Sequence, residues 1–171
     1  MKKIILPILL PSLLALLPFS ADCQPAASFE EQRQMQQRNQ FNAQRINWLN
    51  NYQQAASQSQ ATDKPIVLLF TGTNWCPACM KLEKEVLTTS EFAQGVGGRF
   101  IFLKAEFPDY SEEGIKSSPY YQLLQSHGIE SFPTMVVVNA SGQRLYTVNY
   151  QAGGPSVYIN QLLRKFQGTP Q

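Results

Sequence analysis

Apolar runs bounded by polar turn residues divide most of the chain into strands and helices. Residues 66–70 form an uninterrupted apolar run, which is typical of a strand buried on both faces of a parallel sheet. The pattern predicts three further strands, at residues 100–107, 135–138 and 144–148. It predicts helices at residues 77–88, 120–126 and 155–166, and a polar surface loop at residues 108–119. This order indicates an α/β fold, with a central mixed β-sheet flanked by helices on both faces.

Residues 24–60 form a glutamine-rich N-terminal extension that we expect to be helical. In its second half, Phe41, Trp48, Leu49 and Tyr52 recur at helical spacing, so this half is expected to pack on the domain. The first half has almost no apolar stripe, which leaves two interpretations open: a polar spacer, or a helix that dimerises or docks on a partner. A polar break at residues 58–64 leads into the main domain, which is assigned to residues 61–171.

The first 23 residues have the pattern of a secretory signal peptide. Lys2 and Lys3 precede residues 4–19, which carry no charge and are interrupted by three prolines. A bilayer span needs ~20 apolar residues, so this segment is too short to be a good membrane anchor. We predict cleavage after Cys23 and export to the periplasm. In the alternative, Cys23 is the lipid attachment point of an anchored lipoprotein, although Asp22 before it is unusual for such a signal.

Composition limits the classes of function. The 171 residues suffice for one ordinary domain, and 43% of them are hydrophobic, which is enough for a packed core. The formal net charge is only +2 and no basic stripe is visible, which argues against nucleic-acid binding. No cofactor is expected.

The motif with the clearest chemistry is the cysteine pair Cys76 and Cys79. A structural zinc site needs four ligands, and the other candidates are His127 and Cys23, which is predicted to be removed, so no metal is expected. An inert structural disulfide is a second alternative. However, the pair lies where the loop after a buried strand turns into a helix, and this position favours a reactive thiol.

Helix geometry assigns different roles to the two cysteines. The N-terminus of a helix carries unpaired N–H groups and a partial positive charge, which stabilise a thiolate at Cys76. Cys79 lies one turn further in, with its sulfur within reach of Cys76 but turned toward the protein, where it can resolve a mixed disulfide. Between them stand Pro77, which suits the first helical turn because it has no N–H, and Ala78. Trp75 provides an apolar wall beside the thiol.

Three features together resemble the thioredoxin superfamily: the strand at 66–70, the Trp-Cys-Pro-Ala-Cys motif, and the segment 128–134 before an apolar strand and hairpin. The resemblance implies a thioredoxin-like fold and thiol–disulfide exchange through a redox-active Cys76–Cys79 disulfide. It also implies that Pro133 is a cis-proline opposite the cysteine pair. Phe132 and Thr134 beside it would belong to the substrate-binding segment, where the backbone of Phe132 binds an extended polypeptide.

Short patterns at residues 64–66, 70–72 and 152–154 resemble periplasmic oxidoreductases of this superfamily. They favour a reductant whose partners are proteins with disulfides or thiols and a membrane-bound redox protein; a homodimer is not expected. A disulfide isomerase or an oxidant is the nearest alternative. A non-catalytic binding module with the thioredoxin fold is an alternative from a different class.

One position departs from the thioredoxin pattern. Many thioredoxins carry an acidic residue six positions before the first cysteine, where it helps to move the proton of the buried thiol, but this chain has Phe70 there. Either water or another carboxylate such as Glu106 is expected to take over this task, or proton transfer is slower. His127 is expected to be a capping or surface residue. Four charged side chains near the site are expected to be solvated: Lys81, Glu83, Glu85 and Lys104.

Overall fold

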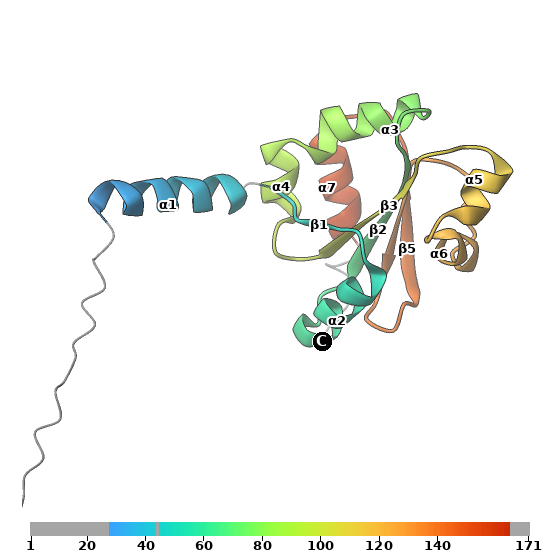
Figure 1. Cartoon of the computed structure of the whole chain (residues 1–171), viewed down its shortest axis with the longest axis horizontal. Helices are drawn as coiled ribbons and strands as arrows, with labels where there is room; N and C mark the ends of the chain where they lie inside the picture. Colours follow the sequence, from blue (N-terminus) through green and yellow to red (C-terminus); the bar gives the residue numbers. More distant parts are fainter. Residues whose placement is uncertain (1–27, 44, 165–171) are drawn as a thin grey trace, which may run out of the picture.

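A mixed sheet forms the centre of the molecule (Figure 1). It has five strands in the order β1-β3-β2-β4-β5. The computed structural model describes residues 28–43 and 45–164, so the predicted signal peptide, with Cys23, lies outside the described residues. The strands are β1 (Trp48–Leu49), β2 (Ile66–Gly72), β3 (Ile101–Phe107), β4 (Thr134–Val138) and β5 (Arg144–Asn149). β3 is parallel to β1 and β2, whereas β4 is antiparallel to both β2 and β5.

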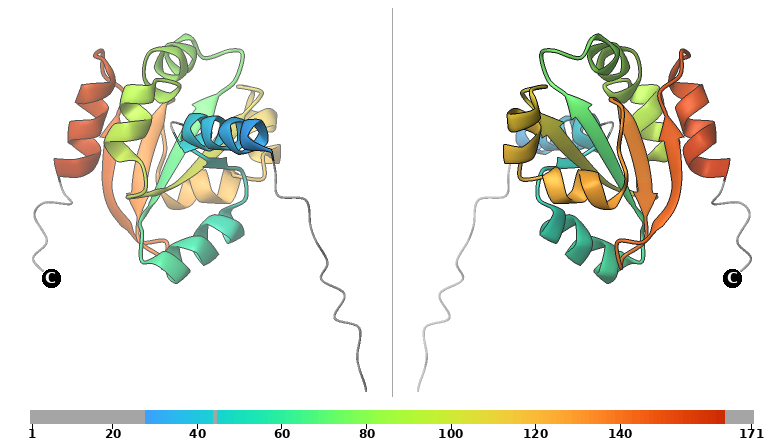
Figure 2. Two further views of the ribbon diagram at one scale, coloured as in Figure 1. Left: turned by 90° about the vertical axis from the view of Figure 1, so that its left-hand side faces the viewer. Right: turned by 90° about the vertical axis from the view of Figure 1, so that its right-hand side faces the viewer.

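Helices cover both faces of this sheet, as the sequence predicts (Figure 2). One face carries α3 (Pro77–Leu82), the π-helical turn η1 (Glu83–Leu87), α4 (Ser90–Val96) and α7 (Pro155–Arg164). The other carries α2 (Tyr52–Thr62), α5 (Glu112–Ser117) and α6 (Tyr121–Ser126). α1 (Phe29–Ala43) projects away from this body (Figure 1). Within the described ranges, no helix combines the length and apolar character needed to cross a bilayer.

Strand β2 explains the uninterrupted apolar run, because it is buried along its whole length. Val67 and Leu69 belong to the core on the α7 side, whereas Leu68 and Phe70 belong to the core on the α6 side. Since side chains alternate across a strand, a central strand covered on both faces is read in the sequence as a continuous apolar run, here residues 66–70.

The sheet register brings two distant segments to one edge. Gly72, at the end of β2, pairs with Phe107, so the loops that follow β2 and β3 leave the sheet together. β4 runs in the opposite direction and begins at Thr134, which pairs with Phe70 near the same end of β2. The cysteine motif after β2 and the Ser131–Pro133 segment before β4 are therefore neighbours, although more than fifty residues separate them in sequence.

The N-terminal extension differs from the single helix predicted for residues 24–60. Trp48 and Leu49 form β1, because Leu49 is buried and the Trp48 ring packs edge-on against Phe102 with 5.2 Å between centroids. A new helix, α2, then begins at the cap Asn51, whose side chain accepts a hydrogen bond from the Gln54 N–H at 3.0 Å. α2 continues to Thr62, so the polar break predicted at 58–64 is wrong over most of its length.

Two short helices were not evident from apolar periodicity. α4 follows the cap Thr89, whose hydroxyl accepts from the Phe92 N–H, and α5 follows the cap Ser111, whose hydroxyl accepts from the Gly114 N–H. α5 occupies part of the loop predicted at 108–119. The last helix ends at Arg164 within the described residues, and its predicted end at residue 166 lies outside them.

Candidate active site

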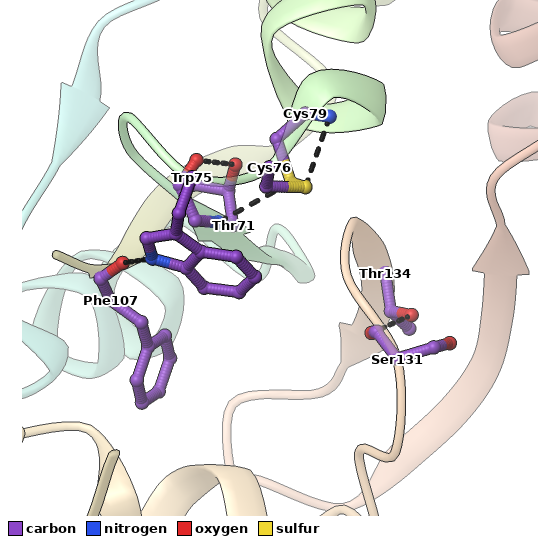
Figure 3. The surroundings of a disulfide bond; sticks show 8 residues. Thr71, Trp75, Cys76, Cys79, Phe107, Ser131 and Thr134 are labelled. Atoms are coloured by element: carbon purple, nitrogen blue, oxygen red, sulfur yellow. Dashed lines mark hydrogen bonds between the residues drawn. A yellow bond between two sulfur atoms is a disulfide. The ribbon is translucent and has the colours of Figure 1, made fainter. Parts of the chain in front are cut away.

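Cys76 and Cys79 form a disulfide at the start of α3 (Figure 3). Cys76 occupies the N-cap position, outside the helix proper, and Pro77 follows at the first helical position as predicted. Cys79 lies within the first turn. Cys76 is 5% exposed and Cys79 is 3% exposed, so both sulfurs are shielded in the oxidised form.

Backbone N–H groups surround the two sulfurs. The N–H of Cys79 donates to Sγ of Cys76 at 3.2 Å, so this sulfur caps the helix. The N–H of Gly72 donates to Sγ of Cys79 at 3.3 Å from the end of β2. The helix terminus and the Cys79 N–H together can stabilise negative charge on Cys76 once the disulfide opens.

Trp75 is held in place on several sides. Its Nε1–H donates to the carbonyl of Phe107 at 2.7 Å (Figure 3). The ring of Phe132 lies edge-on to it, with centroids 5.4 Å apart and planes at 84°. Tyr110 packs on it at 4.8 Å and 44°. Sequence reasoning identified Trp75 and Phe132 but missed Tyr110, because the loop that carries it has no motif.

The segment before β4 lies across from the disulfide (Figure 3). The Phe132–Pro133 peptide bond is cis, as the resemblance implies. Pro133 is buried, and Phe132 is half-buried between Trp75 and Phe107. The Thr134 hydroxyl, in a residue that is 5% exposed, donates to the carbonyl of Ser131 at 2.8 Å. The Thr134 side chain therefore supports this loop from inside.

A cavity of about 370 Å³ lies beside Cys79, lined also by Glu83, Lys104 and Glu106. Nζ of Lys104 contacts both carboxylate oxygens of Glu83, at 2.9 and 3.0 Å. The Lys104 side chain is only 19% exposed, so the expectation that it is a surface cation was wrong, whereas the Glu83 side chain remains 39% exposed. Lys104 was misread because the sequence does not reveal that it pairs with Glu83, which is distant in sequence. Lys81 and Glu85 are exposed, as expected.

Phe70 lies away from this cavity. It is fully buried in the core on the α6 side, with its ring 6.5 Å from that of His127. The cavity beside Cys79 is instead lined by Thr71, on the opposite face of β2. The charged groups that line the cavity come from η1 and β3. Carboxylates therefore lie beside Cys79 even though position 70 carries a phenylalanine instead of an acidic residue.

His127 caps α6 at its C-terminal end, as expected, but it is buried rather than on the surface. Burial lowers the pKa of its imidazole, and the positive charge of nearby Arg144 lowers it further. Arg144 is held there because its Nη1 donates to the His127 carbonyl at 3.0 Å. Among the described residues, no three His, Cys, Asp or Glu side chains come together as a metal site.

Comparison with known proteins agrees with this fold. The family model of the thioredoxin-like domain matches residues 52–167, so the chain belongs to this family. The chain is thus a thioredoxin-like thiol–disulfide oxidoreductase, and the fold predicted from its sequence is confirmed.

Two curated relatives and one solved structure are similar to it. The disulfide bond reductase DsbH of Chlamydia pneumoniae is 28% identical over 129 residues, covering 75% of this chain and 77% of DsbH. The thioredoxin-related protein DsbJ of the same organism is 29% identical over 105 residues, covering 60% of this chain and 30% of DsbJ. A solved DsbH oxidoreductase matches with a TM-score of 0.63 at 26% identity, covering 73% of this chain and 87% of that chain.

Proposed function

We propose that the chain is a periplasmic reductant that opens disulfides in exported proteins, with Cys76 as the attacking thiolate and Cys79 as the resolving thiol. The observation that carries this proposal is the position of the two sulfurs: Cys76 caps α3, whereas Cys79 lies inside the first turn beneath the Gly72 N–H. The similarity to a protein named disulfide bond reductase supports the direction. The N-terminal signal pattern supports export.

The exchange takes place in two steps. The Cys76 thiolate attacks one sulfur of the substrate disulfide; that bond breaks, and the second substrate sulfur leaves as a thiolate that takes up a proton. Cys79 then loses its proton and attacks Sγ of Cys76, which releases the first substrate sulfur. The substrate gains two electrons, and Cys76 and Cys79 lose two as their disulfide forms. A membrane-bound redox protein returns these electrons by the reverse exchange.

Substrate is proposed to lie along the segment that contains Phe132 and Pro133. The backbone N–H and C=O of Phe132 form no hydrogen bond with another described residue, so both are free to bind an extended chain in the manner of an added strand. Pro133 has no N–H of its own to compete for that chain. Thr134 acts indirectly, through its hydrogen bond to Ser131.

The proton of Cys79 is proposed to leave through the cavity beside it. Glu83 and Glu106 both line this cavity, and Lys104 holds the Glu83 carboxylate in place. A carboxylate acting through water can then accept the proton during the second step. This replaces the acidic residue that thioredoxins carry at the position of Phe70.

Trapping with single-cysteine variants tests the assignment. Cys79→Ser should accumulate mixed disulfides with substrate, because Cys76 can attack but nothing resolves the product. Cys76→Ser, the matched control, should accumulate almost none, because its remaining cysteine is inside the helix. Insulin reduction should be lost in both. Equal trapping by the two variants would show that the roles are misassigned, and a wild-type protein that never reduces insulin would favour a non-catalytic module.

A further inference from the structure

Tyr110 stands out because it is a large aromatic residue that is both exposed and attached to the active site. It lies in the loop between β3 and α5, and 69% of its surface is exposed. Its ring packs on Trp75, the residue before Cys76, with 4.8 Å between centroids. Exposed aromatic rings beside a catalytic group are candidates for substrate contact, since they remove water from a bound chain at little cost in conformational entropy.

The loop holds Tyr110 from both sides. The Asp109 carboxylate accepts hydrogen bonds from the N–H of Ser111 at 2.9 Å and from its hydroxyl at 2.7 Å. The same hydroxyl accepts from the N–H of Gly114 at 3.0 Å and so caps α5. A side chain at position 114 would come within 2.5 Å of Asp109, so a glycine lets this turn close tightly. Tyr110 therefore extends from a fixed turn.

The fold itself makes little use of the Tyr110 side chain. Its ring is not part of either buried core, and its hydroxyl forms no hydrogen bond with another described residue. Trp75 contacts Tyr110 on one side and Phe132 on another. Rings from three separate segments, Trp75, Tyr110 and Phe132, thus form a continuous aromatic surface that begins next to Cys76. We call these three residues the aromatic platform.

We propose that Tyr110 determines substrate specificity: with the aromatic platform, it selects extended polypeptides that carry a large apolar side chain next to the disulfide-bonded cysteine. This inference rests on the proposed function, because the substrate strand must pass along Phe132. A neighbouring phenylalanine or leucine then packs on the Tyr110 ring, while the free hydroxyl binds the substrate backbone. A serine or glycine at the same position leaves the platform in water.

Two synthetic peptides test this proposal. Each forms a disulfide with the same reporter thiol, and they differ only in the residue after the cysteine, phenylalanine or serine. Each protein's rate on a peptide is divided by its own rate on hydroxyethyl disulfide, which has no side chain next to the sulfur. This correction removes any general effect of a substitution on the cysteines.

Wild-type protein should prefer the phenylalanine peptide, and Tyr110→Ala should reduce that preference by roughly 2- to 12-fold, the range for loss of one aromatic pair. Tyr110→Phe keeps the ring and should retain most of the preference for the phenylalanine peptide. The preference of Tyr110→Leu should lie between those of Tyr110→Phe and Tyr110→Ala. Leu145→Ala, which removes a 48% exposed apolar side chain on β5, is the matched control and should keep the wild-type preference.

The outcomes separate the two levels of the proposal. Equal normalised rates for both peptides in the wild type, or an unchanged preference in Tyr110→Ala and Tyr110→Leu, would overturn the role of Tyr110 and leave the reductase assignment intact. If the wild-type protein reduces neither peptide nor hydroxyethyl disulfide, the proposed function fails, and the inference about Tyr110 fails with it.

Discussion

Replacement of Gly72 by alanine should disturb both Trp75 and the disulfide. A Cβ at this position would lie 2.5 Å from two ring carbons of Trp75 and 2.9 Å from Cβ of Cys76. Carbon atoms pack at about 3.5–4.0 Å, so the indole would have to move by about 1 Å. The indole cannot move freely, because its Nε1–H donates a hydrogen bond to the Phe107 carbonyl and its ring is packed against Phe132 and Tyr110.

The loss of stability expected for Gly72→Ala follows from these contacts. Overpacking of a fixed site costs about 1–3 kcal/mol, and loss of the hydrogen bond from Trp75 to Phe107 would add about 1 kcal/mol. For a domain of this size, a loss of 2–4 kcal/mol lowers the midpoint of thermal unfolding by on the order of 10 °C. A shift of the Gly72 backbone would also weaken its N–H contact with Sγ of Cys79. Insulin reduction should therefore decrease as well.

Thermal and guanidinium unfolding of the oxidised protein measure this effect directly. Gly154→Ala is the matched control, because a side chain there would meet no atom within 4 Å. The control should stay within about 0.5 kcal/mol of the wild type. If Gly72→Ala is as stable and as active as the control, then Trp75 is not fixed by its neighbours, and the site is more adaptable than the contacts indicate.

Three further predictions concern other parts of the chain. Glu83→Gln should lower the free energy of unfolding by about 0.5–1 kcal/mol, because it breaks a half-buried ion pair with Lys104. Glu85→Gln, which breaks an exposed ion pair with Lys81, is the control. Equal losses of stability in urea unfolding would refute the prediction that the half-buried pair contributes more. His127→Gln should make the free energy of unfolding less sensitive to acid. Because the pKa of His127 is lowered in the folded protein, the unfolded chain takes up a proton at a higher pH than the folded protein does. The stability is therefore complete above the ordinary pKa of 6.5 and decreases below it, by at most ~1.4 kcal/mol per pH unit. Parallel urea titrations from pH 7.5 to 5 check this, and identical slopes would contradict it. The exported protein should begin near Gln24 by intact mass; a mass that retains Cys23 with acyl chains would mean a lipoprotein.

The sequence predicts the parts of the fold in which burial is continuous. The run at 66–70 identified β2 because each of these five side chains is fully buried. β3 was also located, although the partly exposed Lys104 and the exposed Glu106 interrupt its buried side chains. The motif at Cys76 and Cys79 was recognisable because its chemistry requires adjacent residues on one helical turn. The neighbouring Phe-Pro-Thr segment was recognisable from the resemblance.

Elements that depend on single hydrogen bonds or distant contacts could not be predicted in this way. α4 and α5 are each only one or two turns long and depend on the caps Thr89 and Ser111. β1 forms because Trp48 packs against Phe102 of the neighbouring strand β3. This contact overrides the helical spacing of apolar residues in the N-terminal extension. The contact between Trp75 and Tyr110 joins residues that are far apart in sequence, so it depends on the path of a loop.

The reduction potential of the Cys76–Cys79 pair tests the proposed direction of electron flow most directly. It can be measured by equilibrating the purified protein with glutathione or dithiothreitol redox buffers and quantifying the free thiols by mass after alkylation. A reductant should have a potential close to that of thioredoxin, about −270 mV. A value close to that of the strong oxidant DsbA, about −120 mV, would contradict the proposal and make the chain a donor of disulfides.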